Sequence, residues 1–266
     1  METDIKDMNT SEKILYILES NKDSYISGED MASQCGVSRN AVWKAVKDLR
    51  EKGYEIEAIS NKGYKLNADT DIISAEGIRV YLSENTKNLN ILVFDSLNST
   101  SDKAKELAMK GYDHGTAVVA ITQSEGRGRK DHSFFSPKGG LYMSIILKPE
   151  MLRNTDSNVV TSFVGNAVID AINELTGIEP YIDGINDLYV DGKKISGILL
   201  ESGSEFDSNT LQWIVAGIGI NFDSDISKFP KDVKKRASSL FDTGKATITK
   251  NMLIAKIIEN ITNCQP

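Results

Sequence analysis

Residues 122–137 read Thr-Gln-Ser-Glu-Gly-Arg-Gly-Arg-Lys-Asp-His-Ser-Phe-Phe-Ser-Pro, and a β-branched run flanks them on each side. Both runs, residues 116–121 and 141–147, have the apolar character of buried strands. Two glycines alternate with two arginines in the loop between them: Gly126, Arg127, Gly128 and Arg129. Glycine lets a backbone approach a ligand closely, and a guanidinium group binds carboxylate or phosphate through two hydrogen bonds. The stretch therefore predicts a cationic loop over an anionic small molecule, although a solvated hairpin tip can have the same composition.

The composition describes an ordinary globular protein. The chain has 266 residues, of which 26% are charged and 40% hydrophobic, enough for one large domain or two smaller ones. It has no long apolar run and no apolar core of a secretory signal near its N-terminus, so we expect a cytoplasmic protein without a membrane partner. Two cysteines and two histidines argue against a disulfide framework and a zinc site. The net charge of −7 argues against bulk nucleic-acid binding but allows a local basic face.

Residues 11–66 form a helix-turn-helix pattern. Apolar residues at helical spacing predict a first helix over residues 11–20, a second that Ser27 can cap and a third that Ser38 caps, running to about Lys52. A glycine turn at residues 34–37 separates the second helix from the third. Two short runs joined by a glycine turn then predict a β-hairpin wing over residues 54–59, 61–63 and 64–66.

The third predicted helix is the candidate DNA reader. It carries five Lys or Arg residues and two acidic residues, and its first turns would reach base edges. The candidate DNA-binding residues lie along this helix and at the wing tip: Ser38, Arg39, Asn40, Trp43, Lys44, Lys47 and Lys62. The alternative is a solvated charged face, with Trp43 in the core.

A polar stretch at residues 67–71 predicts a domain boundary. We expect a winged helix-turn-helix domain at 1–66, a linker at 67–74 and a second domain at 75–266. The second domain mixes predicted helices at 74–84, 103–110, 158–175 and from Thr249 with predicted strands at 89–94, 116–121, 141–147, 185–190, 193–201 and 213–222.

Two further segments carry candidate ligand contacts. Asp191 and Gly192 predict a hairpin turn, after which Lys194 would lie near Asn186 and Asp187 on the partner strand. Such a lysine can stabilise negative charge on carboxylate and phosphate, or can only protect a sheet edge. Glycines in the apolar run 213–222 indicate close approach of a ligand or of another backbone.

These motifs together resemble the bacterial bifunctional biotin protein ligase, also called the biotin operon repressor. The resemblance covers essentially the whole chain, and five motifs in order carry it: Gly126–Arg129 with Phe135–Pro137, Gly140–Ser144, Asn186–Leu188, Gly192–Ile198 and Gly217–Asn221. It implies an α+β protein in which a winged helix-turn-helix domain precedes a class II synthetase-like domain with a central mixed sheet flanked by helices. The family normally continues after this region with a small β-barrel, whereas this sequence ends at Pro266.

The resemblance also implies a reaction and its partners. Biotin and ATP with Mg²⁺ give biotinyl-5′-AMP, and the biotinyl group then passes to a lysine of a biotin carboxyl carrier protein. The adenylate is also the corepressor that promotes a homodimer on operator DNA.

The family's motifs assign site residues to this sequence. Biotin would contact Ser99, Thr100, Ser101, Gln123, Arg127, Gly128, Arg129 and Lys194. The nucleotide would contact Gly126, Arg129, Asn186, Asp187, Gly217, Gly219 and Asn221. Lys194, Arg127 and Asp187 would be catalytic, with Asp187 also the Mg²⁺ ligand.

Two stretches depart from the family's pattern. The run Lys130-Asp-His-Ser-Phe134 replaces a glycine, an arginine and a tryptophan. Asp183-Gly184-Ile185 stands where the family has a lysine-tryptophan pair and one further residue. These departures favour, as the alternative, a non-catalytic or weakly catalytic ligand-sensing repressor of the same fold. A related acyl ligase, such as a lipoyl ligase, is a third reading.

Overall fold

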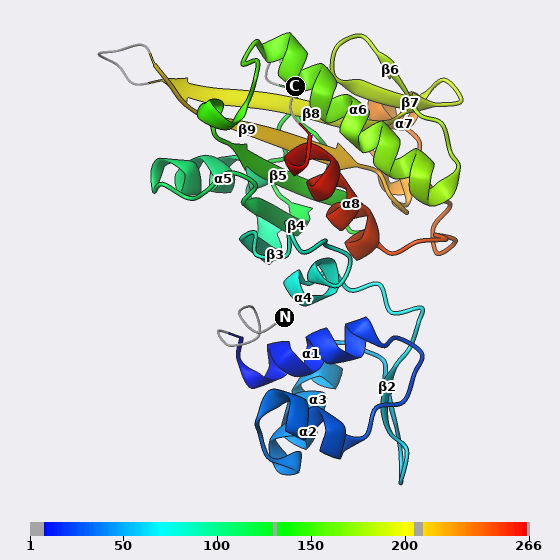
Figure 1. The fold of residues 1–266 in the computed structure, drawn as a ribbon. Helices are drawn as coiled ribbons and strands as arrows, with labels where there is room; N and C mark the ends of the chain where they lie inside the picture. The colour runs from blue at the N-terminus through cyan, green and yellow to red at the C-terminus, as the bar shows by residue number, and fades with distance from the viewer. Residues whose placement is uncertain (1–7, 130–131, 205–209, 265–266) are drawn as a thin grey trace. The chain divides into compact units, whose positions relative to one another are not determined.

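Figure 1 shows a computed structural model of the chain, which describes residues 8–129, 132–204 and 210–264. Its contacts divide the chain into two compact units, Met1–Asn88 and Leu89–Pro266. The sequence-based boundaries at residues 66 and 74 stay a prediction. The contacts add that residues 75–88 group with the N-terminal unit.

The N-terminal unit has the predicted order of three helices and a wing. Its elements are α1 (Thr10–Ser20), α2 (Gly28–Cys35), α3 (Arg39–Glu51), β1 (Ile56–Ile59), β2 (Gly63–Leu66) and α4 (Ala75–Arg79). Ser27 and Ser38 cap α2 and α3 as predicted, because each side chain accepts a hydrogen bond from the backbone three residues on. Asn61 takes a left-handed conformation in the turn between the paired strands β1 and β2.

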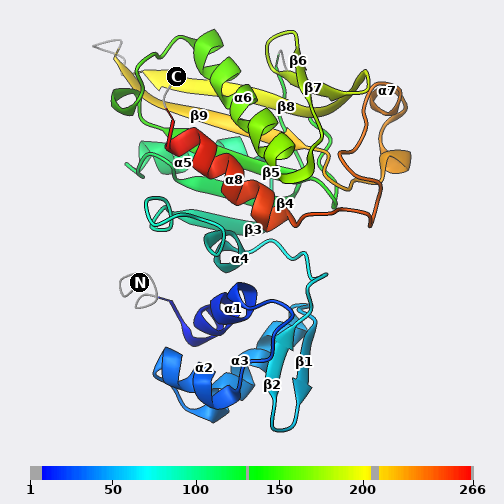
Figure 2. The ribbon, with the colours of Figure 1, turned by 45° about the vertical axis from the view of Figure 1, so that its right-hand side comes forward.

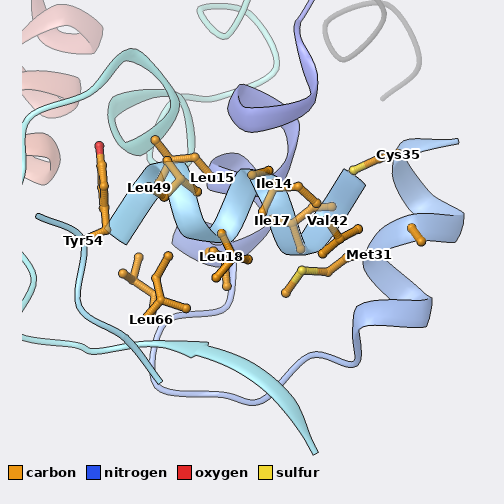
Figure 3. Close-up of a cluster of buried hydrophobic side chains, with 14 residues drawn as sticks. Ile14, Leu15, Ile17, Leu18, Met31, Cys35, Val42, Leu49, Tyr54 and Leu66 are labelled. Carbon is orange, nitrogen blue, oxygen red and sulfur yellow. The ribbon is translucent and has the colours of Figure 1, made fainter. Parts of the chain in front are cut away.

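One face of each of the helices α1, α2 and α3 builds a common core, which Figure 3 shows in close-up. Ile14, Met31, Val42 and Leu66 are fully buried there. Trp43, on the other side of α3, is 54% exposed, so the alternative that placed it in the core is wrong.

Helix α4 is shorter than predicted. The sequence predicts a helix at 74–84, but α4 ends at Arg79. Further along, the backbone N–H groups of Thr86 and Lys87 bond to the Ser83 carbonyl, and the Ser83 and Thr86 hydroxyls lie 3.1 Å apart. These hydroxyls favour a local turn over helix continuation. Ile78 on α4 is fully buried, and α4 packs against α1.

The second unit is built on a seven-stranded mixed sheet. Its strands are β3 (Ile91–Leu97), β4 (Ala117–Gln123), β5 (Leu141–Leu147), β6 (Tyr181–Asp183), β7 (Asp187–Val190), β8 (Lys193–Ser204) and β9 (Leu211–Ile220). They lie in the order β3-β4-β5-β9-β8-β7-β6, and β3 is parallel to β4 while the other neighbours are antiparallel. The predicted α+β class with a central mixed sheet is confirmed.

Helices cover both faces of this sheet. They are α5 (Thr100–Met109), α6 (Ser157–Thr176), the one-turn α7 (Lys231–Lys234) and α8 (Lys250–Thr262), with short 3₁₀ turns at Pro149–Met151 and Ile226–Lys228. The helices α6 and α8 lie side by side against one face in both views (Figures 1 and 2). On the other face α5 forms an apolar cluster with Val118, Ile146 and Val215. Every residue of β5 is buried, as a central strand covered on both sides requires.

Several predicted element ends move by a few residues. Helix α5 begins at Thr100 rather than 103, because Ser99 is its cap. Strand β7 begins at Asp187 rather than 185, since Gly184 takes a positive φ of 79° in the turn before it. Strand β6 was not predicted. No helix in the described ranges is long and apolar enough to cross a bilayer.

Candidate functional site

A cavity of about 430 Å³ lies in the second unit, at the ends of the central strands. All but one of the predicted ligand contacts line it: Ser99, Thr100, Ser101, Gln123, Arg127, Gly128, Arg129, Asn186, Asp187, Lys194, Gly217, Gly219 and Asn221. The exception is Gly126, where a Cβ would lie 2.3 Å from the Phe134 carbonyl oxygen and 2.5 Å from the Ser136 hydroxyl. Gly126 therefore serves the packing of the loop. The structure brings the predicted residues together, while their ligand roles stay predictions.

Strand register puts glycines on the cavity side of the sheet. Gly197 on β8 pairs with Gly219 on β9, and Gly217 lies two residues away on the same face. Ile198, the next residue after Gly197 on β8, has its side chain on the opposite face, near Gly165 of α6. Because they have no side chains, these glycines leave space over this face of the sheet, which larger residues at the same positions would fill.

The close approach that these glycines predict is made by protein side chains. A Cβ at Gly219 would lie 2.7 Å from the Phe134 ring, and one at Gly217 would lie 2.6 Å from the Ser101 hydroxyl. The Phe134 ring also lies within 6.0 Å of the Lys194 ammonium. Phe134 therefore covers these glycines beside Lys194.

A chain of hydrogen bonds joins the start of α5 to the glycine-arginine loop. The Ser144 hydroxyl lies 3.1 Å from that of Ser101 and donates to Thr100 at 2.8 Å. Thr100 donates from its backbone N–H and its hydroxyl to the Gln123 carbonyl oxygen, at 2.8 and 3.1 Å. The Gln123 amide donates to Ser136 at 2.9 Å. These buried polar groups are mutually oriented, as a preformed polar subsite requires.

A chain of ion pairs joins the loop to α5 and β8. Arg127 lies 3.0 Å from Asp102 on α5, Asp102 lies 2.8 Å from Lys105, and Lys105 lies 2.8 Å from Glu201 on β8. Burial alone would lower the pKa of Lys105, but these two carboxylates raise it above its usual value. Arg127 is thus engaged as a loop anchor.

The loop itself is a narrow hairpin. Gly128 N–H bonds to the His132 carbonyl at 2.6 Å, and Phe134 N–H bonds to the Gly126 carbonyl at 2.7 Å. Two of the residues that depart from the family's pattern, Lys130 and Asp131, lie outside the described residues.

Lys194 and Asp187 form the charged centre of the cavity. The Lys194 ammonium lies 2.8 Å from the Asp187 carboxylate, and the two side chains are 28% and 27% exposed. Asn186 donates to the Ile198 carbonyl at 2.9 Å and accepts from Arg129 at 3.4 Å. The alternative that Lys194 only protects a sheet edge is therefore not favoured, since Lys194 points into the cavity.

A segment after β9 closes one end of the cavity. Arg236 and Ser238 bond through their backbones to Lys194, each at 2.8 Å, so that residues 236–238 extend the sheet beside β8. The Asn221 side-chain amide donates to the Ser238 carbonyl at 2.9 Å, and the buried oxygen of the same amide has no hydrogen-bond donor among the described residues. A buried acceptor of this kind suits a ligand that brings a donor.

Sequence reasoning missed several residues of this cavity. Four of them line it: Phe134, Tyr189, Val233 and Arg236. Asp102 and Ser136 do not line it but contact two residues that do, Arg127 and Gln123. Ser136 lay within a motif that the sequence does show, and the other contacts arise between distant segments. The residue pattern within each of these segments does not indicate such contacts.

The DNA-reading candidates are exposed on the N-terminal unit. Arg39, Asn40, Trp43, Lys44, Lys47 and Lys62 all lie on its surface, and Ser38 caps α3. Arg50, which contributed to the positive charge of the predicted helix, donates two hydrogen bonds to the Ile56 carbonyl in the wing. Its role is therefore to join α3 to the wing.

Two family models match the chain. Residues 10–65 match an HTH domain, and residues 93–221 match the biotin/lipoate A/B protein ligase family. The fold and the cavity thus define a protein in which a winged helix-turn-helix unit accompanies a ligase-type α+β unit.

Individual relatives agree with this class. The Bacillus subtilis bifunctional ligase/repressor BirA is 36% identical over 242 residues, which cover 90% of this chain and 72% of that protein. The Escherichia coli bifunctional ligase/repressor BirA is 30% identical over 82% of this chain and 65% of its own length. The biotin protein ligase from Aquifex aeolicus, solved in complex with biotin and ATP, aligns with a TM-score of 0.55 at 29% identity, covering 65% of this chain and 69% of that one. The chain belongs to the biotin protein ligase family, in its branch of bifunctional ligase/repressors.

Proposed function

We propose that this protein activates biotin with ATP, transfers it to a lysine of a biotin carrier protein, and represses transcription in response to biotin. The observation that carries the proposal is one cavity holding both a polar subsite, built on Thr100 and Gln123, and a cationic centre at Lys194. The solved Aquifex aeolicus relative binds biotin and ATP. Membership in the bifunctional branch supports the repressor role.

The reaction that we propose has two steps. A carboxylate oxygen of biotin attacks the α-phosphorus of ATP and pyrophosphate leaves, which gives biotinyl-5′-AMP. The carrier's lysine amine then attacks the biotinyl carbonyl carbon, an amide forms, and AMP leaves with the proton lost to solvent. Neither step needs a covalent bond to the enzyme, so positioning and charge stabilisation supply the catalysis.

Lys194 is the residue that we assign to charge stabilisation. Asp187 and the backbone bonds to Arg236 and Ser238 hold it at the cavity's centre. The ammonium group there can neutralise charge that builds on the biotin carboxylate and the α-phosphate during attack. The hydroxyl and amide groups at the other end of the cavity would orient biotin's polar ring.

The residues of the cavity do not by themselves fit a protein-held magnesium ion. Asp187 is the single carboxylate among the described lining residues, and Lys194 already neutralises it at 2.8 Å. The described ranges contain no group of three or more His, Cys, Asp or Glu side chains placed to hold a metal. The assignment of Asp187 as the Mg²⁺ ligand therefore stays a prediction, and no step above depends on it.

The ligase proposal is tested by incubating the pure protein with ATP, biotin and a biotin carrier domain. We expect pyrophosphate, biotinyl-5′-AMP and a carrier heavier by one biotinyl group in the mass spectrum. Lipoate replaces biotin in a parallel reaction and should give neither product. Absence of adenylate and of carrier labelling at saturating substrates would overturn the ligase proposal.

The repressor role has a separate test. The protein should shift its own upstream DNA in a gel more strongly with biotin and ATP present, because we also propose that the adenylate favours a homodimer. Retained binding by a variant with both Arg39→Ala and Lys44→Ala would count against α3 as the DNA reader. Sedimentation with and without ligands tests the dimer.

A further inference from the structure

The cations of the cavity differ in whether a carboxylate already neutralises them. Arg127 lies 3.0 Å from Asp102, and Lys194 lies 2.8 Å from Asp187. The other two Lys or Arg residues that line the cavity, Arg129 and Arg236, have no carboxylate within 4.0 Å in the described part of the chain. Unneutralised guanidinium groups in a cavity are available for an anionic ligand.

Arg236 is held in place by its backbone. Its carbonyl accepts a hydrogen bond from Lys194 N–H at 2.8 Å, and its own N–H donates to Val233 at 3.1 Å. Ala237 forms a parallel bridge with Lys194, so Arg236 has a fixed register beside the strand that carries the cavity's central lysine. Its side chain is exposed and lines the cavity.

Strand order separates Arg236 from the polar subsite, because Arg236 is bonded to Lys194 of β8 whereas Gln123 and Ser144 lie on β4 and β5, with β9 in between. Tyr189 of the neighbouring strand β7, Ile185 and Val233 also line the cavity. Burial raises the pKa of the Tyr189 hydroxyl, and Asp187 and Asp183 raise it further, whereas the charge of Arg236 lowers it. The guanidinium group is therefore close enough to act on Tyr189 of β7, which lies on the side of β8 away from β4 and β5.

We propose that Arg236 binds the pyrophosphate end of the nucleotide triphosphate and stabilises pyrophosphate as the leaving group. This proposal rests on the proposed ligase function. When biotin occupies the polar subsite, attack at the α-phosphorus beside Lys194 directs the leaving group away from biotin, toward the end where Arg236 lies. A planar guanidinium group matches two phosphate oxygens, and Arg236 has no carboxylate partner to give up first.

The two half-reactions separate this role from a structural one. Arg236→Ala should raise the KM for ATP about tenfold, the effect of losing one charge-assisted phosphate contact on a partly exposed side chain. The inhibition constant of pyrophosphate should rise by a similar factor. Transfer from preformed biotinyl-5′-AMP to the carrier should keep its wild-type rate, because that step contains no pyrophosphate. Arg236→Lys should recover part of the loss.

Lys235→Ala is the matched control, since Lys235 is an exposed neighbour that does not line the cavity. We expect it to leave both half-reactions unchanged. An Arg236→Ala protein with wild-type KM for ATP and wild-type pyrophosphate inhibition would overturn the proposal, and so would an equal loss in the transfer step.

Calorimetric titration with ATP and with pyrophosphate tests Arg236 without any turnover. If the wild type forms no adenylate but binds pyrophosphate about tenfold more tightly than Arg236→Ala, the ligase proposal fails and the anion site stands. If the wild type binds neither ligand, both proposals fail.

Discussion

Replacing Lys194 by alanine should slow adenylate formation by more than the loss of one cation. The ammonium group lies 2.8 Å from Asp187. Removing one preorganised charge stabiliser costs about 10²–10³-fold in turnover. The substitution also leaves Asp187 as an unpaired carboxylate where two anionic substrates must bind. An unpaired charged group of this kind costs about 1–3 kcal/mol, and the 28% and 27% exposure of the two side chains favours the low end of that range.

The part of the loss that Asp187 causes should be recoverable. We expect the double variant Lys194→Ala, Asp187→Asn to be about tenfold faster than Lys194→Ala alone, since 1.4 kcal/mol corresponds to a factor of ten. Pyrophosphate release at saturating biotin and ATP measures each rate, and exposed Lys193→Ala is the control. A double variant as slow as the single variant, or slower, would refute this reasoning and assign Asp187 a role independent of Lys194.

Three further outcomes follow from single contacts. His114 accepts a hydrogen bond from Lys148 N–H, and burial lowers the pKa of its imidazole below 6.5. The stability that neutral His114 contributes is therefore fully present above pH 6.5 and is lost as the pH falls through the lower pKa of the folded state. Urea unfolding as a function of pH should show this loss in the wild type and not in His114→Ala. Gly219→Ala would bring a Cβ within 2.7 Å of the Phe134 ring. Displacing that ring should lower the unfolding free energy by about 1–3 kcal/mol and weaken ligand binding in calorimetry. Unchanged affinity would contradict the role of Phe134 in covering the glycines beside Lys194. Trp43→Ala should weaken operator binding in gel shifts while changing the unfolding free energy by less than about 0.5 kcal/mol, because Trp43 is 54% exposed.

Local chemistry predicted much of the fold. Ser27, Ser38 and Thr249 cap helices where the sequence indicates, because capping depends on a residue and its next few neighbours. Asp191 and Gly192 form the predicted hairpin turn, with φ angles of 49° and 73°. This hairpin places Lys194 of β8 next to Asp187 of β7.

Contacts between distant segments could not be predicted in this way. The glycines of β9 indicated a close approach, but nothing local shows that Phe134 and Ser101 are what approaches. The pairing of residues 236–238 with Lys194 joins segments about forty positions apart, and it has no periodic signature in either segment. The Arg127 and Asp102 pair is similar, because each charge alone resembles a solvated surface residue.

The packing of α4 has a practical consequence for dissecting the protein. A fragment that stops at residue 66 keeps every DNA-reading candidate but discards buried Ile73 and Ile78, and with them the hydrogen bond from Lys22 to the Thr70 carbonyl. The part of α1 that α4 covers would then face water, and any apolar surface exposed in this way favours self-association of the fragment. Isolated binding studies are therefore better begun with a fragment that ends at Asn88, where the contacts themselves divide.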